Sequence, residues 1–129
     1  MQKAVSFIGR IQYTDLPGYI CVGDIFAMPS RSRFAGLEVE GLGIVYLEAS
    51  ACGVPVLAGK SGGAPDSVLD GKTGLLVNGR NHHDVGAALI KLLSDQPLRQ
   101  KMGADGRVWM EQLWSWEGIG ARFEEIISD

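Results

Sequence analysis

Apolar runs of strand length alternate with helical patterns along the first part of the chain. Four short apolar runs, each bounded by Gly or Pro, predict strands at residues 4–8, 24–28, 55–58 and 74–77. Helices are expected between them, at residues 14–22, 44–52 and 64–69. Strands that alternate with helices favour a parallel sheet with right-handed crossovers. We therefore expect an α/β fold, with a Rossmann-like parallel sheet of about four strands and flanking helices.

After the fourth predicted strand the pattern is helical. The short polar side chains of Thr14, Asp95 and Ser115 precede helical patterns and can cap their free backbone N–H groups. His82 and His83 are expected to cap or precede the first C-terminal helix. The apolar stripes of the three C-terminal helices have the spacing of one buried face; they comprise Val85, Ala88, Leu89, Leu92 and Leu93, then Leu98, Met102, Trp109 and Leu113, then Ile119, Phe123, Ile126 and Ile127.

Glycine-rich loops follow the predicted strands, at Gly9 and over residues 30–43 and 59–63. Open parallel sheets bind ligands at the carboxyl ends of their strands. Glu40 lies in the second of these loops. Glu48 follows eight residues later, about one turn inside the predicted helix and on a largely apolar face.

A carboxylate on an apolar helix face needs hydrogen-bond donors to offset its loss of hydration, and ribose hydroxyls are such donors. The free N–H groups around residues 43–45, at the start of the same helix, favour a phosphate. From spacing alone, Glu48 could equally be a solvated surface charge and Glu40 a loop charge. The Gly-x-Gly at residues 41–43 lacks the third glycine of a dinucleotide fingerprint, and residues 53–61 have one residue too many for a P-loop.

The composition narrows the possible partners. The chain of 129 residues is 46% hydrophobic and 21% charged, and its net charge is −3. No basic cluster suggests nucleic acid, and no apolar run has the length of a membrane span. The N-terminus has no signal-peptide pattern. Cys21 and Cys52 are isolated from each other and from the histidines, which argues against a disulfide framework or a zinc site and is typical of a reducing, cytoplasmic compartment.

The stretch from Glu40 to Glu48 resembles the E-x7-E signature of family-four glycosyltransferases, which are retaining enzymes with the GT-B fold. The resemblance continues in the family's order through nearly the whole chain. Its segments are Phe7-Ile8-Gly9, the strand and proline turn at 24–30, Ala51-Cys52-Gly53-Val54-Pro55-Val56, Ser61-Gly62-Gly63-Ala64-Pro65-Asp66, the turn and strand at 71–77, Met102-Gly103 and Ser115-Trp116.

Within that family, residues 29–33 and 36–45 look most like the phosphatidylinositol mannoside mannosyltransferases. Phe34, Ala35 and Glu38 depart from that subfamily's pattern. The resemblance implies GDP-mannose as the donor and a lipid or glycan as the acceptor, without a cofactor. No Asp-x-Asp occurs, which suits a metal-independent enzyme, and we expect transfer to survive a chelator.

The family's roles carry over residue by residue. Glu40 would be the catalytic residue and contact donor-sugar hydroxyls beside the reacting carbon, while Glu48 would bind the ribose hydroxyls. Arg31 and Arg33 are either surface charges or contacts to phosphate or sugar. The remaining donor-binding residues would be Gly43, Ile44 and Val45 at the sugar and diphosphate, and Gly9, Arg10 and Ile11 beside the base.

The resemblance further implies a single partial domain over residues 1–129, the donor-binding half of a larger enzyme. The arginine and lysine that clamp the diphosphate, and the N-terminal domain that holds the acceptor, do not appear in it. We expect the isolated chain to bind donor at most, with millimolar affinity, and to self-associate through an exposed sheet edge. Two alternatives remain: a sugar-nucleotide epimerase of the same fold, or a non-catalytic nucleotide- or protein-binding module.

Overall fold

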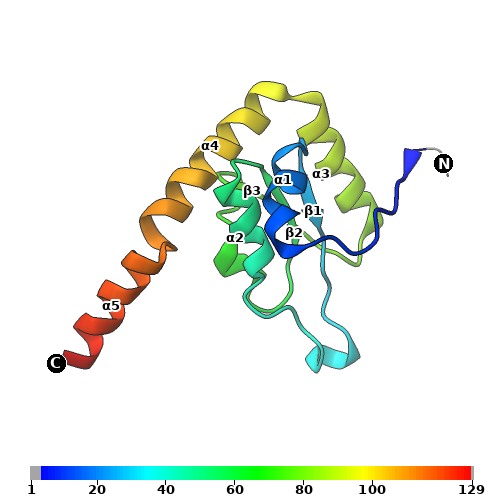
Figure 1. Ribbon diagram of the computed structural model, residues 1–129. Helices are drawn as coiled ribbons and strands as arrows, with labels where there is room; N and C mark the ends of the chain where they lie inside the picture. The colour runs from blue at the N-terminus through cyan, green and yellow to red at the C-terminus, as the bar shows by residue number, and fades with distance from the viewer. Residues whose placement is uncertain (1–3, 129) are drawn as a thin grey trace.

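The computed structural model describes residues 4–128, so residues 1–3 and 129 of the predicted domain lie outside the described range. Its centre is a parallel sheet in the order β1 (Phe26–Met28), β2 (Val56–Gly59), β3 (Gly74–Val77). Ala27 lies opposite Leu57, and Leu57 opposite Leu75. The α/β class and the parallel sheet are therefore confirmed (Figure 1).

The strand predicted at residues 4–8 is wrong. This segment forms no strand and pairs with none in the described part of the chain, and the sheet has three strands there. Phe7 is 95% exposed and Ile8 60% exposed. A strand needs backbone partners on a neighbouring strand, and Figure 1 shows the segment leading away from the sheet toward the N-terminus. The run of apolar side chains has the pattern of a strand, but the segment lacks the neighbouring strand that would pair with it.

Helices cover both faces of the sheet (Figure 1). In chain order they are α1 (Leu16–Cys21), α2 (Ile44–Ala51), α3 (His82–Ser94), α4 (Gln96–Leu113) and α5 (Trp116–Ser128). Short 3₁₀ helices occur at Tyr13–Asp15, Phe34–Gly36 and Ala64–Ser67. The last of these replaces the α-helix expected over residues 64–69.

Alternation along the strands divides the core in two. Val56 and Ala58 face α1 and α2, where they pack with Ile20, Tyr46 and Ala49. Leu57 and its neighbours on β3 face the other way, against α3 and α4; this cluster is Leu57, Val77, Ala88, Leu92 and Met102. All four residues of β2 are buried, as expected for the central strand of a parallel sheet covered on both faces.

Capping side chains set most of the helix starts. Asp95 accepts the N–H of Leu98 at 2.9 Å, and Ser115 accepts that of Gly118 at 3.1 Å, so both predicted caps are confirmed. Asn81 caps α3, which begins at His82. The predicted Thr14 cap is wrong, because Thr14 lies inside the 3₁₀ turn before α1 and its hydroxyl donates to Asp15 instead.

Helix α4 packs closely on α2 through two glycines. A Cβ atom on Gly103 would lie 2.0 Å from the carbonyl oxygen of Gly53, which follows α2 in the left-handed conformation. Helix α5 continues from α4 away from the body of the molecule (Figure 1) and contains no buried residue. The buried face expected for its apolar stripe is therefore wrong, and Phe123, Ile126 and Ile127 are each more than half exposed. The folded core thus ends with α4.

Candidate functional site

Three loops meet at the carboxyl ends of the strands, where the sequence places the ligand site. The loop after β1 contacts the end of β2 so closely that a Cβ on Gly59 would lie 1.7 Å from the Ser30 carbonyl oxygen. The loop after β2 is tied to β3 by the N–H of Lys60, which donates to Val77 at 2.8 Å. Glycine at residue 59 is therefore required by the approach of two backbones.

The segment that carries Glu40 rests on the loop after β2. The N–H of Glu40 donates to the Ser61 hydroxyl oxygen at 3.3 Å, and the N–H of Gly63 donates to the Gly41 carbonyl at 2.9 Å. A Cβ on Gly62 would lie 1.8 Å from the Glu40 carbonyl oxygen. The Glu40 backbone is thus fixed, while its side chain is only half-buried.

Tyr46 packs under the loop after β1 and forms hydrogen bonds where that loop begins. Its ring is fully buried, and its hydroxyl donates to the Met28 carbonyl at 2.9 Å and lies 3.0 Å from the Ser30 hydroxyl. Burial raises the pKa of the Tyr46 phenol, the Ser30 hydrogen bond lowers it, and the charge of Glu40 raises it again. Gly43 adopts φ 75°, and a Cβ there would lie 2.4 Å from the Tyr46 ring. Only glycine fits at the start of α2.

The first turn of α2 presents free backbone donors. Gly43 is the N-cap residue and has no side chain to cap the helix. Within residues 4–128, no hydrogen bond occupies the N–H groups of Ile44 and Val45. Donors of this kind at a helix N-terminus favour an anion. The structure therefore brings the predicted phosphate contacts next to the Glu40 loop.

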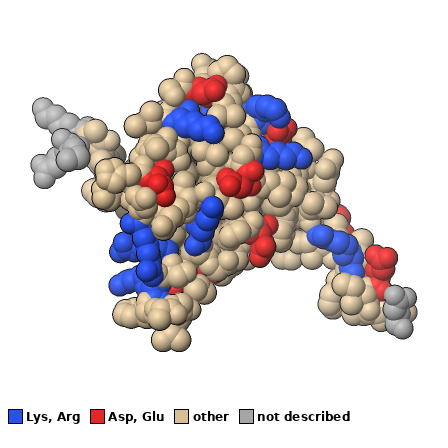
Figure 2. All heavy atoms as spheres, turned by 180° about the vertical axis from the view of Figure 1, so that it is seen from behind, with Lys and Arg blue, Asp and Glu red and all other residues tan. Residues whose placement is uncertain are grey.

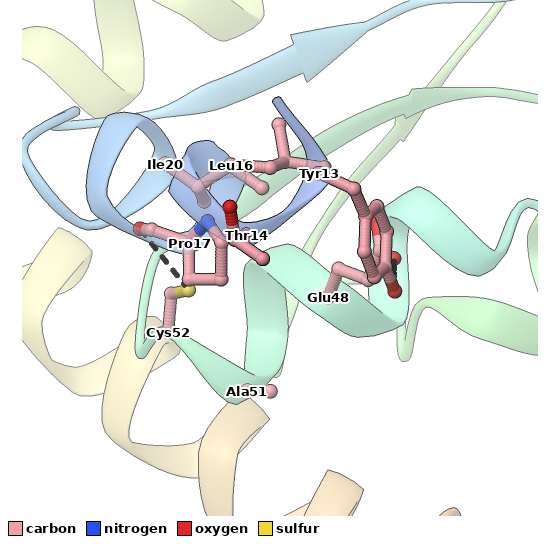
Figure 3. Close-up of a pocket in the computed structure, with 8 residues that line it drawn as sticks. All are labelled: Tyr13, Thr14, Leu16, Pro17, Ile20, Glu48, Ala51 and Cys52. Atoms are coloured by element: carbon pink, nitrogen blue, oxygen red, sulfur yellow. Dashed lines mark hydrogen bonds between the residues drawn. The ribbon is translucent and has the colours of Figure 1, made fainter. Parts of the chain in front are cut away.

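Glu48 lies one turn further along α2, in the wall of a pocket between α2 and α1 (Figure 3). The Tyr13 hydroxyl donates to the Glu48 carboxylate at 3.3 Å. The pocket has a volume of about 440 Å³ and is mostly apolar. Its lining residues are Tyr13, Thr14, Leu16, Pro17, Ile20, Glu48, Ala51 and Cys52.

The segment predicted to border the base enters this region from the N-terminal side. Gly9 is left-handed and exposed, and Ile11 is half-buried. Two residues after Ile11 the chain reaches Tyr13 and its contact with Glu48. Between residues 4 and 128, no hydrogen bond joins Gly9, Arg10 or Ile11 to the Glu40 loop or to α2, so their roles stay predictions.

Sequence reasoning missed three side chains that position the site: Tyr13, Tyr46 and Ser61. Tyr46 and Ser61 are buried, and an aromatic or a small polar residue at such positions has the pattern of ordinary core. Tyr13 lies just before the predicted helix, without any signal that it faces Glu48. Gly62-Gly63 was the available clue, because adjacent glycines between two loops often mark close backbone approach.

Neither cysteine is in a disulfide: Cys21 is exposed and Cys52 half-buried. The Cys52 thiol donates to the Pro17 carbonyl at 3.8 Å. Burial, and next the neighbouring Cys21 thiol, raise the pKa of Cys52 to about 11. The thiolate, which is the nucleophile, is thereby disfavoured at Cys52.

Iodoacetamide at pH 8 should therefore label Cys21 well before Cys52. A thiol with a pKa near 11 is ionised in only about one molecule in a thousand at that pH. Peptide mass spectrometry over a time course measures both sites, and labelling in urea, where the two should react alike, is the control. Equal rates in the folded chain would contradict the placement of Cys52.

Two searches of the described residues bear on metals and membranes. From residue 4 to residue 128, no group of three His, Cys, Asp or Glu side chains is arranged to hold a metal ion. None of the helices in that range combines the length and the apolar character needed to cross a bilayer. That transfer proceeds without a divalent cation stays a prediction.

Comparison with known proteins gives the family. Residues 1–109 match the family model described as "Glycosyl transferases group 1". The chain is 52% identical over 124 residues to a GDP-mannose-dependent alpha-(1-6)-phosphatidylinositol monomannoside mannosyltransferase of Mycolicibacterium smegmatis, covering 96% of this chain and 32% of that protein. It is 53% identical over 127 residues to the corresponding monoacylated-lipid mannosyltransferase of Corynebacterium glutamicum, covering 98% and 33%.

Solved structures agree with this result. Sucrose-phosphate synthase from Thermosynechococcus elongatus superposes with a TM-score of 0.85 at 29% identity, over 98% of this chain and 30% of that one. The C-terminal domain of a glycosyl transferase group 1 protein from Francisella tularensis gives 0.73 at 29% identity, over 85% and 53%. The chain spans about a third of the length of the mannosyltransferases it matches. Because the family model matches residues 1–109, which is most of its length, the chain belongs to the group 1 glycosyl transferases.

Proposed function

We propose that the complete protein transfers mannose from GDP-mannose to a phosphatidylinositol mannoside with retention, and that this chain forms part of its donor-binding half. The support is the family match together with two relatives above 50% identity whose names specify GDP-mannose and that class of acceptor. The same relatives favour transfer over epimerisation. Donor binding is supported by one observation: the free N–H groups at the start of α2 lie one turn from the Glu48 carboxylate on the same helix.

The donor would bind along α2. The N–H groups of Ile44 and Val45 would donate to the diphosphate, and the helix dipole would stabilise its charge as the bond to the sugar breaks. Glu48 would accept hydrogen bonds from the ribose hydroxyls. Glu40, held in place by Ser61 and Gly63, would orient the sugar by accepting from its hydroxyls.

Tyr13 gives this arrangement a specific consequence. Its hydroxyl donates to the Glu48 carboxylate, so a ribose hydroxyl would either replace it or add a second donor. A carboxylate oxygen can accept more than one hydrogen bond. Glu48 would therefore accept hydrogen bonds from Tyr13, from the ribose or from both.

The open edge of the sheet and the lipid acceptor lead to two further proposals. Strand β1 is paired on one side only, by β2, among the described residues, and such an edge can pair with another chain. We propose that the isolated chain self-associates through it.

We also propose that the complete protein works in the cytoplasm, at the inner face of the membrane where its lipid acceptor would lie.

Glu48→Gln in the complete protein should weaken GDP-mannose binding about 10- to 150-fold, because a hydrogen bond to a charged group contributes about 1.5–3 kcal/mol. Titration calorimetry measures the affinity. Glu111→Gln, an exposed change of the same kind on α4, is the matched control and should leave the affinity unchanged. Folding should be little affected by either change, which a thermal melt checks.

Unchanged affinity in Glu48→Gln would remove Glu48 from the donor site. The reaction itself is tested separately by product analysis. Mannosylated lipid is the expected product, and an isomerised sugar nucleotide with no lipid product would favour the epimerase alternative instead.

A further inference from the structure

Cationic side chains follow all three strands at the carboxyl edge of the sheet. Arg31 and Arg33 come after β1, Lys60 after β2 and Arg80 after β3. The chain as a whole has a net charge of −3, so this concentration runs against its average. Figure 2 shows Lys and Arg side chains gathered on one side of the molecule, at the lower left of that view.

The three arginines, Arg31, Arg33 and Arg80, line one open pocket with a volume of about 380 Å³. Its other lining residues are Ser32 and Phe34. Arg80 is anchored, because its guanidinium donates to the Ser32 carbonyl. Arg31 has neither an ion pair nor a side-chain hydrogen bond to any residue between 4 and 128. Guanidinium groups present planar pairs of donors that fit phosphate oxygens.

A single carboxylate offsets part of this charge. Glu38 lies 3.4 Å from the Arg33 guanidinium, and both side chains are more than half exposed. An exposed ion pair of this kind is weak and can exchange with another anion. Among residues 4–128, Arg31 and Arg80 have no carboxylate partner, and the partner of Arg33 is replaceable.

The loop beside the pocket is strained and apolar. Phe34 and Ala35 adopt φ 47° and 55°, a region that residues with a side chain rarely enter. The Arg33 guanidinium lies 5.3 Å from the Phe34 ring centre. Phe34 is 67% exposed and Leu37 is 90% exposed. Basic side chains beside exposed apolar ones are typical of surfaces that bind anionic lipid interfaces.

We propose that this pocket binds the phosphate of an anionic phospholipid headgroup, while Phe34 and Leu37 enter the boundary between headgroups and acyl chains. The apolar loop favours a lipid over a free phosphate, since a soluble anion would gain nothing from Phe34 or Leu37. None of the residues that line the pocket is among the proposed donor contacts on α2, while the Ser61 hydroxyl joins Ser32 of the pocket to the Glu40 backbone. Only the choice of phosphatidylinositol as the probe rests on the proposed function.

The test is sedimentation of the chain with vesicles of phosphatidylcholine, with and without phosphatidylinositol. The chain should bind only the anionic vesicles, and the binding should weaken with salt. Arg31→Gln should lower the affinity about fivefold, the effect of one basic residue at such a surface. Leu37→Ser should lower it several-fold. Matched controls are Arg107→Gln on α4, which is more than half exposed, and Val22→Ser, which is 84% exposed; neither should matter.

Equal binding to both kinds of vesicle, or an equal loss in Arg107→Gln, would overturn the proposal. A second arm measures GDP and inorganic phosphate by calorimetry. If Arg31→Gln weakens those ligands and leaves vesicle binding unchanged, the pocket takes a free phosphate and the lipid assignment is wrong. Loss of GDP binding in Glu48→Gln concerns the donor site alone, so either conclusion can fail without the other.

Discussion

Gly62→Ala should destabilise the chain by about 2–5 kcal/mol, the sum of a left-handed backbone at alanine and a forced contact. Gly62 has φ 53°, and its added Cβ would lie 1.8 Å from the Glu40 carbonyl oxygen. The Glu40 oxygen belongs to the backbone and the position of a Cβ is set by its own backbone, so no side-chain rotation can relieve the contact. The strain is relieved only if the Glu40 segment moves, and donor affinity of the complete protein should fall with it.

Urea denaturation followed by circular dichroism measures the loss of stability, and calorimetry with GDP-mannose measures the affinity. Gly41→Ala is the matched control in the same pair of loops. No atom lies within 4 Å of its added Cβ, and its φ is outside the left-handed region. If Gly62→Ala were as stable as Gly41→Ala, the close approach of the two loops would be wrong.

Gly103→Ala should also destabilise the chain, by about 1–2 kcal/mol, although alanine is the better helix former. The added Cβ would lie 2.0 Å from the Gly53 carbonyl oxygen. Helix α4 would have to move away from α2, and the adjacent Met102 would lose part of its packing in the core. The contact cost exceeds the gain of up to about 1 kcal/mol from helix propensity.

Gly86→Ala on α3 should change the free energy of unfolding in the opposite direction, measured in the same urea experiment. Nothing lies within 4 Å of that added Cβ, so only the propensity term remains and the chain should gain about 0.5–1 kcal/mol. The two midpoints in urea should therefore shift in opposite directions. Shifts of the same sign would mean that α4 does not pack on Gly53 as described.

The sequence predicted the parts of the fold that depend on local pattern. Residues 74–77 are a strand as expected, and the helix expected from residue 44 begins there, directly after the N-cap residue Gly43. The failure at residues 4–8 has a simple cause. Periodicity reports whether a segment could pair, whereas pairing depends on a neighbour that the pattern does not specify.

The candidate site was predictable to the level of its elements. Glu40 lies in a loop and Glu48 inside a helix, both as expected. What could not be read from the sequence is how the loops are held. The Ser61 hydroxyl lies between Glu40 and Ser32, which are 21 and 29 residues away along the chain. Such contacts arise only when the fold brings the ends of β1 and β2 together.

Helix α5 has a consequence for any measurement of unfolding. Because it buries no residue, its melting exposes little new apolar surface. The denaturant m-value and the heat-capacity change of unfolding both scale with newly exposed surface. Both quantities should therefore report the cooperative unit that ends with α4. In this chain α5 can fray as a separate, low-energy event while the sheet and its loops remain intact.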